Sequence, residues 1–233
     1  MSQKPQWLNI LSHIPRCIPP ISQYICYENL FFKKNQLCMK LLLIILSVIF
    51  LLFLGSQLLF YKSRHDIEEY KYVIIKEHPG FEIRKYEASL FTSVELDTDD
   101  YKQASSKGFS ILGGYIFGKN EREEQISMTS PVAMTLEADE TTMMFLVPEK
   151  KSKEDMPKPV NTNIKFIEIP ERKMAAISFR GWANNQKIEK FKLELVRLLD
   201  QEGIRHANKF LVLGYNPPYE VLFRKNEIVV ELE

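Results

Sequence analysis

The chain has 233 residues, 45% of them apolar, so it can bury the core of one domain and still carry an additional segment. The net charge is +1 but is unevenly spread. Residues 1–65 hold seven of the 31 basic residues and one acid, Glu28, which leaves 24 basic and 29 acidic residues for the remainder. An acidic remainder argues against a nucleic-acid-binding surface, because such surfaces are basic.

Residues 1–38 show no sustained hydrophobic period and contain all three cysteines, Cys17, Cys26 and Cys38. Met39 and Lys40 lead directly into an apolar run, as at the start of a membrane-targeted chain. We therefore expect residues 1–38 to be an irregular N-terminal segment, an extension upstream of a true start at Met39. The chain after Met39 has no cysteine, which excludes a disulfide framework, a thiolate zinc site and a cysteine nucleophile there.

The segment from Leu41 to Tyr61 carries no charge and is long enough to cross a bilayer as a helix. We expect a transmembrane anchor over residues 39–62. A buried core helix would need apolar partners on every side. A cleaved signal peptide is the better alternative, but the run exceeds the roughly 7–15 residues of a signal core and no Ala-x-Ala site follows it.

Charges on the two sides of this segment predict its orientation. Arg16, Lys33, Lys34 and Lys40 precede it. Lys62 and Arg64 follow it, but Asp66, Glu68 and Glu69 come directly after them. The positive-inside rule then places the N-terminus in the cytoplasm and the C-terminal domain on the non-cytoplasmic side.

After a charged linker over residues 63–71, alternating apolar residues predict strands in a domain over residues 72–233. Residues 72–77 and 81–86 form a hairpin around Pro79 and Gly80, and a third strand spans 89–96. Asp99 or Asp100 caps a helix that ends near Gly118. Its apolar positions recur at spacings of three and four: Tyr101, Ala104, Gly108, Ile111, Leu112 and Tyr115. Strands over 126–137, interrupted by Pro131, and 141–148 complete this half.

The same order of elements recurs in the second half. Residues 163–169 and 173–179 are expected to pair around Pro170, and Asn184 or Asn185 opens a helix that Gly203 closes. Strands over 210–216 and 227–233 follow. The repeat predicts an α+β domain with pseudo-twofold symmetry, in which two antiparallel halves form a curved sheet of six or eight strands with the helices outside.

Two motifs have structural as well as functional interpretations. The run Gly113 to Asn120, "GGYIFGKN", is close to a phosphate-binding loop, but Asn120 replaces the required Ser or Thr and the run ends a helix, so nucleotide binding is dismissed. Four glycines lie in or at the end of this helix, although each interior glycine costs about 1 kcal/mol. Close packing on the sheet is the preferred explanation; a slot for a planar ligand is the functional one.

Reactive or metal-binding side chains do not cluster in the sequence. His65, His78 and His206 are expected at the surface, and none has a partner at metal-ligand spacing; His206 is the weak candidate for an iron ligand. No acid–base pair and no nucleophile elbow is found, so an enzyme is not indicated. Met128, Met134, Met143 and Met144 suit core filling or an adaptable pocket.

Two long motifs resemble the SOUL haem-binding family. The first is "GFSILGGYIFGKNEREEQISMTSPVAMTLE", in which a Tyr-Ile-x-Gly-x-Asn turn leads into a Met-Thr-x-Pro-Val strand. The second is "LGYNPPYEVLFRKNEIVVEL", and "FEIRKY" matches the family's entry strand. The resemblance is collinear from about Tyr72 to Leu232. It implies a distorted antiparallel β-barrel with two flanking helices and an exposed apolar groove for haem or another tetrapyrrole.

By this resemblance, the first helix, neighbouring strands and the C-terminal segment line the groove. The implied cofactor-binding residues are Phe109, Leu112, Gly113, Ile116, Met134 and Tyr219. The methionines of residues 126–137 are then expected to face the barrel interior or its mouth. Some relatives have a histidine proposed to ligate iron where this chain has Lys85, so axial ligation is not implied. Lys119, Arg122 or Arg224 would meet the propionates.

The predicted function is therefore a membrane-anchored protein that binds, carries or sequesters haem non-covalently in an apolar groove. An effector-binding or interaction module without haem, for amphipathic small molecules or a partner helix, is the alternative from another class. An enzyme would require a buried acid of perturbed pKa near the groove.

Overall fold

The computed structural model of the chain describes residues 21–63, 67–136, 141–217 and 220–233. The chain divides into two compact units, Met1–Ser56 and Gln57–Glu233. Helix α1 (Ile21–Ser63) starts upstream of Met39. It contains Gln36–Leu59, a stretch of 24 residues long and apolar enough to cross a membrane.

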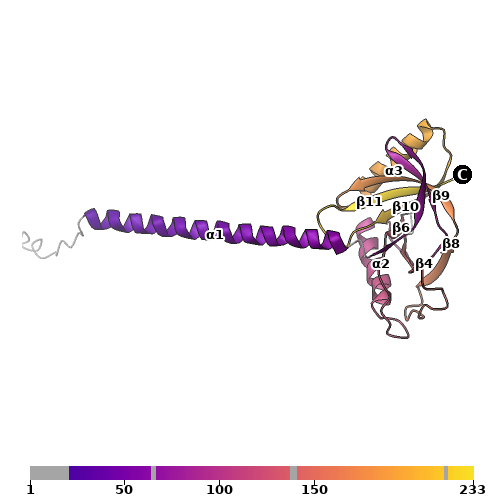
Figure 1. The fold of residues 1–233 in the computed structure, drawn as a ribbon, viewed down its shortest axis with the longest axis horizontal. Coiled ribbons are helices and arrows are strands. Elements are labelled where there is room, and N and C mark those ends of the chain that lie inside the picture. The colour runs from indigo at the N-terminus through magenta and orange to yellow at the C-terminus, as the bar shows by residue number, and fades with distance from the viewer. Residues whose placement is uncertain (1–20, 64–66, 137–140, 218–219) are drawn as a thin grey trace, which may run out of the picture. The chain divides into compact units, whose positions relative to one another are not determined.

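The second unit is built on one large antiparallel sheet with two helices, so the predicted α+β class is confirmed (Figure 1). The described part of the chain contributes nine strands to it, in the order β2-β3-β9-β11-β10-β6-β7-β4-β8. The strands are β2 (Tyr72–His78), β3 (Phe81–Tyr86), β4 (Ser89–Leu96), β6 (Val132–Leu136), β7 (Thr141–Leu146), β8 (Lys165–Ile169), β9 (Arg172–Arg180), β10 (His206–Gly214) and β11 (Lys225–Leu232). Because β2 and β8 do not pair, the distorted sheet remains an open barrel.

The predicted internal repeat is visible in the strand order. In the first half, β4, helix α2 (Tyr101–Ile116), β6 and β7 follow one another along the chain, and the three strands lie side by side in the order β6-β7-β4. In the second half, β9, helix α3 (Asn185–Gln201), β10 and β11 follow one another along the chain, and the three strands lie in the matching order β10-β11-β9. The two halves meet where β6 and β10 pair, with Met134 opposite Val212.

The strand before each repeat crosses to the other half. Strand β3 precedes β4 but pairs with β9, and β8 precedes β9 but pairs with β4. The predicted pairing of residues 163–169 with 173–179 around Pro170 is therefore wrong. This exchange brings β8 and the β2–β3 hairpin into one sheet, which is why nine strands are found in place of six or eight.

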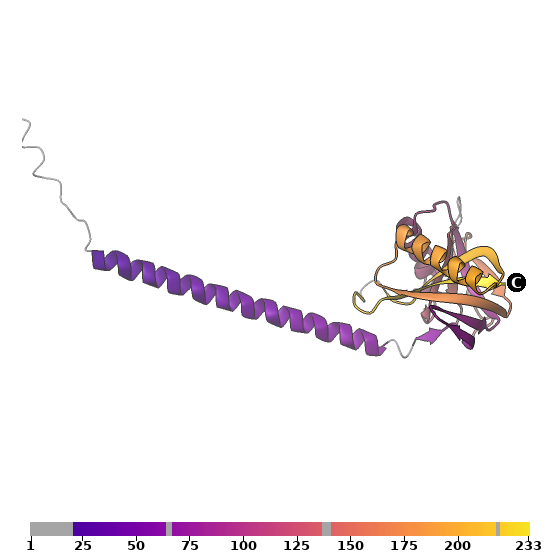
Figure 2. The ribbon, with the colours of Figure 1, turned by 90° about the horizontal axis from the view of Figure 1, so that it is seen from above.

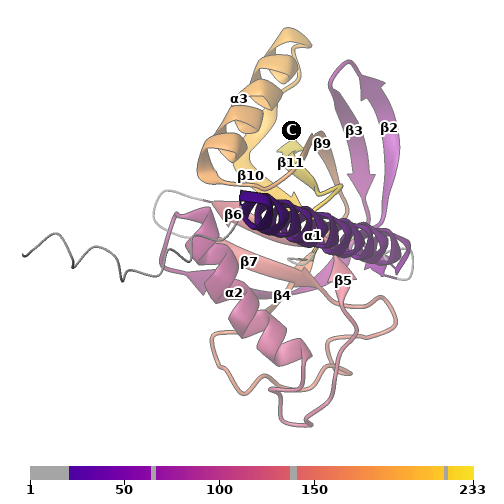
Figure 3. The same ribbon diagram turned by 90° about the vertical axis from the view of Figure 1, so that its left-hand side faces the viewer.

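Both helices cover the same face of the sheet, and alternation along the strands separates two layers of core. Helix α2 packs on β4 and β7, and α3 packs on β9, β10 and β11 (Figures 2 and 3). Met143 and Phe145 of β7 point toward α2, whereas Met144 and Leu146 belong to the cluster on the opposite face. That opposite face includes Tyr70, Tyr86, Phe91, Met174, Leu211, Leu213, Tyr215 and Val229.

The segment that contains Pro131 is split as predicted. Its first part is the short β5 (Thr129–Ser130), which pairs in parallel with β1 (Glu68–Glu69), and its second part is β6. Met134 is 2% exposed and packs in the cluster beneath α2, on the helix-covered face of the sheet. It therefore does not face the barrel interior.

The N-termini of the two helices are joined. Asp100 caps α2 by accepting a hydrogen bond from Gln103 N at 2.8 Å, as expected for an N-cap. The first residue of α3, Asn185, accepts from Tyr101 N at 2.9 Å, and its amide donates to Asp99 O. These contacts connect the two repeats at one end of both helices.

Candidate functional site

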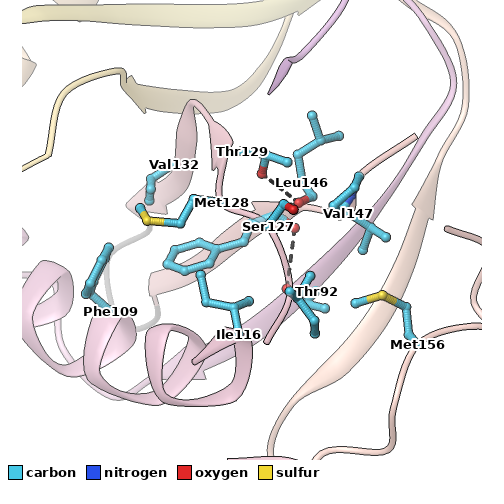
Figure 4. Close-up of a pocket in the computed structure, with 13 residues that line it drawn as sticks. Thr92, Phe109, Ile116, Ser127, Met128, Thr129, Val132, Leu146, Val147 and Met156 are labelled. Carbon is cyan, nitrogen blue, oxygen red and sulfur yellow. Dashed lines mark hydrogen bonds between the residues drawn. The ribbon is translucent and has the colours of Figure 1, made fainter. Parts of the chain in front are cut away.

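A shallow apolar hollow lies beside α2, where the helix faces the segment before β6. Phe109 and Ile116 project into it from α2, and Met128 and Val132 lie opposite them (Figure 4). The remaining lining comes from the strands, the segment before β5 and the loop after β7: Thr92, Ile126, Ser127, Thr129, Phe145, Leu146, Val147, Pro148 and Met156. Thr129 Oγ1 donates to Leu146 O at 2.7 Å, so one of its few polar groups is satisfied internally.

The hollow is mostly filled by its own side chains. Its enclosed volume is about 20 Å³, room for about one water molecule, and with its open mouth it spans about 360 Å³. Pockets for small ligands measure roughly 300–1,000 Å³. The apolar lining suits the face of a macrocycle, but a macrocycle can enter only if the mouth widens. Met128 is 37% exposed and unbranched, so it is the side chain best able to move aside.

The implied cofactor-binding residues have different surroundings. Phe109 and Ile116 line the hollow, and the Phe109 ring lies 5.5 Å from the Phe145 ring. Leu112 is fully buried on the side of α2 that faces the sheet, and Met134 belongs to the same core cluster. Gly113 is buried against Phe109, whose ring an added Cβ would approach to 3.2 Å. Tyr219 lies outside the described residues.

The glycine-rich helix is explained in part by close packing. A Cβ on Gly108 would come within 2.7 Å of Met143 Sδ and 3.0 Å of Leu96 Cδ1. Gly108 thus allows α2 to approach the sheet, as the structural interpretation predicted.

Neither His78 nor His206 lines the hollow, and His65 lies outside the described residues. His206 begins β10, and its Nδ1 lies 2.7 Å from Ala207 O. His78, which we expected at the surface, has a side chain that is only 4% exposed, stacked on Phe81 and beside Glu202. Lys85 forms an ion pair with Glu171. In the described ranges, no group of three or more His, Cys, Asp or Glu side chains could hold a metal ion.

Asn120, the residue that departs from a phosphate-binding loop, organises the turn after α2. It is 3% exposed, and its amide donates to Tyr115 O and Glu124 O. Its Oδ1 accepts from Arg122 N and Glu124 N. Arg122 lies in this turn. Its guanidinium donates to Asp155 O and to the carbonyl of Met156, a residue that lines the hollow. Arg122 is therefore a proposed propionate partner that contacts a lining residue of the hollow.

The other two proposed partners are placed differently. Arg224 donates to Asn216 O, Pro217 O and Glu220 O and lies over the Trp182 ring, so it holds the loop before β11. It does not line the hollow. The Lys119 side chain runs along Gly114 at the end of α2.

A buried polar network on the opposite face of the sheet escaped the sequence analysis. Glu227 is fully buried and accepts two hydrogen bonds from Arg84, at 2.8 and 3.0 Å. Tyr215 Oη and Ser178 Oγ also donate to it, at 2.6 and 2.9 Å. Arg84 lies 4.3 Å from the centre of the Tyr72 ring. The signal that could have revealed it is the presence of Arg84, Tyr215 and Glu227 in the entry and C-terminal motifs.

The network keeps Glu227 ionised. Burial alone would raise the pKa of this carboxyl, but the hydrogen bonds and charge of Arg84, with Lys225 and Tyr215, lower it to about 2. Glu227 is thus a buried acid of perturbed pKa, the feature an enzyme would need. It does not line the hollow and is already occupied by Arg84.

With this geometry established, the comparisons with known proteins define the class. Residues 67–231 match the family model described as SOUL heme-binding protein, and the chain belongs to this family. Similar proteins include Heme-binding protein 2 of Mus musculus, 31% identical over 66% of this chain and 79% of that protein. Heme-binding protein 1 of Xenopus laevis is 25% identical over 66% of this chain and 84% of that protein.

Solved structures support the fold alone. The EcmrR C-terminal domain has a TM-score of 0.51 and 11% identity, covering 66% of this chain and 96% of that chain. A structure titled as a hydrolase from Listeria innocua has a TM-score of 0.50 and 11% identity over 68% of this chain and 94% of that chain. The sheet and its two helices therefore occur in proteins with little sequence in common, and function has to be argued from the site.

Proposed function

We propose that the second unit binds haem or a related tetrapyrrole non-covalently in the hollow beside α2, and that α1 anchors it to a membrane. The observation that carries the binding proposal is the mostly apolar lining of the hollow, with the adaptable Met128 at its mouth. Membership of the SOUL family and the names of the curated relatives support haem as the ligand.

Binding would rest on burial of the macrocycle's apolar faces. Phe109 and Ile116 would contact one face and Val132 the other, and displacement of Met128 would open the mouth. Arg122 would meet a propionate at the rim, where its guanidinium already lies beside the Met156 carbonyl. Iron chemistry would be supplied by the haem itself, and the described side chains at the hollow offer thioethers but no imidazole.

The proposed location follows from α1 and the flanking charges. The segment Gln36–Leu59 would span the membrane once, and the positive-inside rule would put the domain on the non-cytoplasmic side. Residues 63–71 would link the anchor to the haem-binding domain over 72–233. Residues 1–38 would precede the native start at Met39.

Titration of residues 67–233 with haem tests the binding proposal. We expect a saturable shift of the Soret band at about one equivalent, with micromolar affinity because apolar burial in a shallow hollow is modest. Phe109→Asp should weaken binding at least about tenfold, since it places a charge in the lining, worth more than about 1.4 kcal/mol. Circular dichroism should show that the variant is folded.

The matched control is Leu193→Asp, which introduces the same charge on the outer face of α3, where Leu193 is 59% exposed. It should leave the titration unchanged. An unchanged affinity in Phe109→Asp, or a flat titration of the parent domain, contradicts the proposed site.

The effector-binding alternative places amphipathic ligands in the same hollow; a separate site for cationic amphiphiles on the opposite face of the sheet is disfavoured by the buried network. An anionic group surrounded by aromatic rings is what such a ligand needs. Glu227 and the Tyr72, Tyr86 and Tyr215 rings provide these groups, but the Arg84 guanidinium already fills the position. We therefore expect lipophilic cations not to bind at Glu227.

A further inference from the structure

Two exposed aromatic side chains gather at one end of the sheet. Trp182 follows β9 and is 55% exposed, and Phe223 precedes β11 and is 54% exposed. Their loops are joined, because Gly181 N donates to Arg224 O and Asn226 Nδ2 donates to Gly181 O. Val221, 44% exposed, lies in the same loop as Phe223. We call Trp182, Val221, Phe223 and Arg224 the aromatic patch.

The backbone of the patch is held in a costly conformation. Phe223 has φ of 61°, in the left-handed region that large side chains rarely adopt. Arg224 donates to three carbonyl groups of its own loop, which keeps the loop in this shape. Strain retained by dedicated contacts is typical of functional segments. Here its effect is to present an aromatic ring at the surface.

Basic side chains border the patch, and the acids Asp99 and Asp100 at the start of α2 lie on its α3 side, where Asn185 bonds to Asp99 O and Tyr101 N. Arg180 is exposed at the end of β9, Arg224 lies 4.0 Å over the Trp182 ring, and Lys187 donates to Arg180 O. The acids nearest in sequence, Glu220 and Glu227, are 1% and 0% exposed, so they contribute little to this surface. Aromatic rings with arginine and lysine are the side chains that settle at the interface of an anionic bilayer.

The chain enters the domain at the same end. Tyr70, directly after β1, donates from its backbone N to Ser130 O at 2.9 Å. Ser130 Oγ in turn donates to Tyr215 O at 3.5 Å, and Tyr215 leads into the loop of the patch. Only residues 60–67 separate Leu59, the end of the apolar stretch, from Glu68, and eight residues reach at most roughly 28 Å. The tether thus limits how far this end of the domain can lie from the bilayer surface.

The geometry points to a membrane-docking surface: the aromatic patch inserts into the headgroup region of a bilayer that contains anionic phospholipid, while α1 spans it. This inference rests on the proposed anchoring by α1. Docking would also hold the segment from Ser127 to Ser130 near the membrane, because this segment contains β5, which pairs with β1 where the chain enters the domain. The mouth of the hollow, which this segment lines, would then lie near the membrane as well.

Tryptophan fluorescence of the full chain tests the inference. The sequence has two tryptophans, Trp7 and Trp182, so Trp7→Phe makes Trp182 the only reporter. The protein is reconstituted in nanodiscs of phosphatidylcholine and phosphatidylglycerol with or without brominated acyl chains. We expect a blue-shifted Trp182 emission that brominated lipid quenches, and weaker quenching when phosphatidylglycerol is omitted, when salt is raised or in Arg180→Gln.

The control moves the reporter to another loop. Trp7→Phe, Trp182→Phe and Val160→Trp together place a single tryptophan at a site that is 69% exposed in the parent and bridges to Asn120 through Pro159. Its emission should not be quenched. Equal quenching at both sites, or none at Trp182 in a chain that co-elutes with nanodiscs, overturns the docking surface and leaves the anchor intact. A chain that does not co-elute refutes the anchor, and the tethered docking with it.

Discussion

At the scale of single residues, Arg84 and Glu227 illustrate how a buried ion pair can be retained. Their side chains are 3% and 0% exposed, and the carboxylate is fully hydrogen-bonded by Arg84, Tyr215 and Ser178. Taking both charges out of water is costly, so the pair need not add net stability over apolar replacements. Removing one partner is different, because it leaves a buried charge uncompensated.

Arg84→Met should therefore lower the free energy of unfolding by about 3 kcal/mol, the lower end of the range for broken buried pairs, because Lys225 Nζ remains 2.9 Å from Glu227. The double variant Arg84→Met, Glu227→Met should recover most of this loss. Urea denaturation of the domain measures both. Additive losses in the double variant would show that the pair acts through packing alone.

The same pair should make the free energy of unfolding depend on pH in the acidic range. The ordinary pKa of Glu227 is 4.5 and its folded pKa is about 2. A lowered folded pKa means that the unfolded state binds the proton first, so the stabilisation is present above pH 4.5 and is lost as pH falls toward 2. Unfolding free energies between pH 6 and 2 should fall more steeply in the parent than in the double methionine variant. Parallel curves would contradict the assignment.

At the scale of elements, α2 shows why helix propensity alone does not decide which residue occupies a position in a helix. Alanine at position 108 would favour the helix by about 1 kcal/mol, but its Cβ would meet Met143 Cβ at 3.0 Å and Leu96 Cδ1 at 3.0 Å. Overpacking costs roughly 1–3 kcal/mol, so the packing term exceeds the propensity term. The glycine is what allows the helix to lie on β4 and β7.

Gly108→Ala should destabilise the domain by up to about 2 kcal/mol, the overpacking cost less the gain in helix propensity. Gly114→Ala is the matched control, since its Cβ would meet only the flexible Lys119 side chain, 3.1 Å from Cδ. That variant should be neutral or more stable by up to about 1 kcal/mol. Thermal and urea unfolding of the two variants side by side provide the measurement. Stabilisation by both substitutions would mean that α2 can move away from the sheet.

At the scale of the whole molecule, the question is whether α1 anchors the domain. Deletion of residues 39–62 should release the protein from membranes, whereas the full chain should resist alkaline carbonate. The pair Leu46→Lys and Phe50→Lys should weaken retention, because each lysine near the centre of a span costs about 2.5–3.5 kcal/mol. Fractionation with immunoblotting measures retention. A mature protein that begins after Tyr61 would instead identify the segment as a cleaved signal.

Much of this molecule was predictable from the order of its residues. The apolar stretch in α1, the two helices with their Asp100 and Asn184 caps, the break at Pro131 and the pseudo-repeat follow from local rules of spacing, charge and capping. The family motifs pointed to Phe109 and Ile116, both of which line the hollow. The functional roles of these two residues remain predictions.

Only the tertiary structure decided which strands pair and which side chains meet. Nothing in residues 163–179 signals that β8 leaves β9 for β4, because the alternation in each strand is satisfied by either partner. Met134 has the spacing of a strand residue, but which face α2 covers depends on how the two halves join at β6 and β10. Arg84 and Glu227 lie 143 positions apart, and their attraction depends on distance in space, which no local pattern encodes.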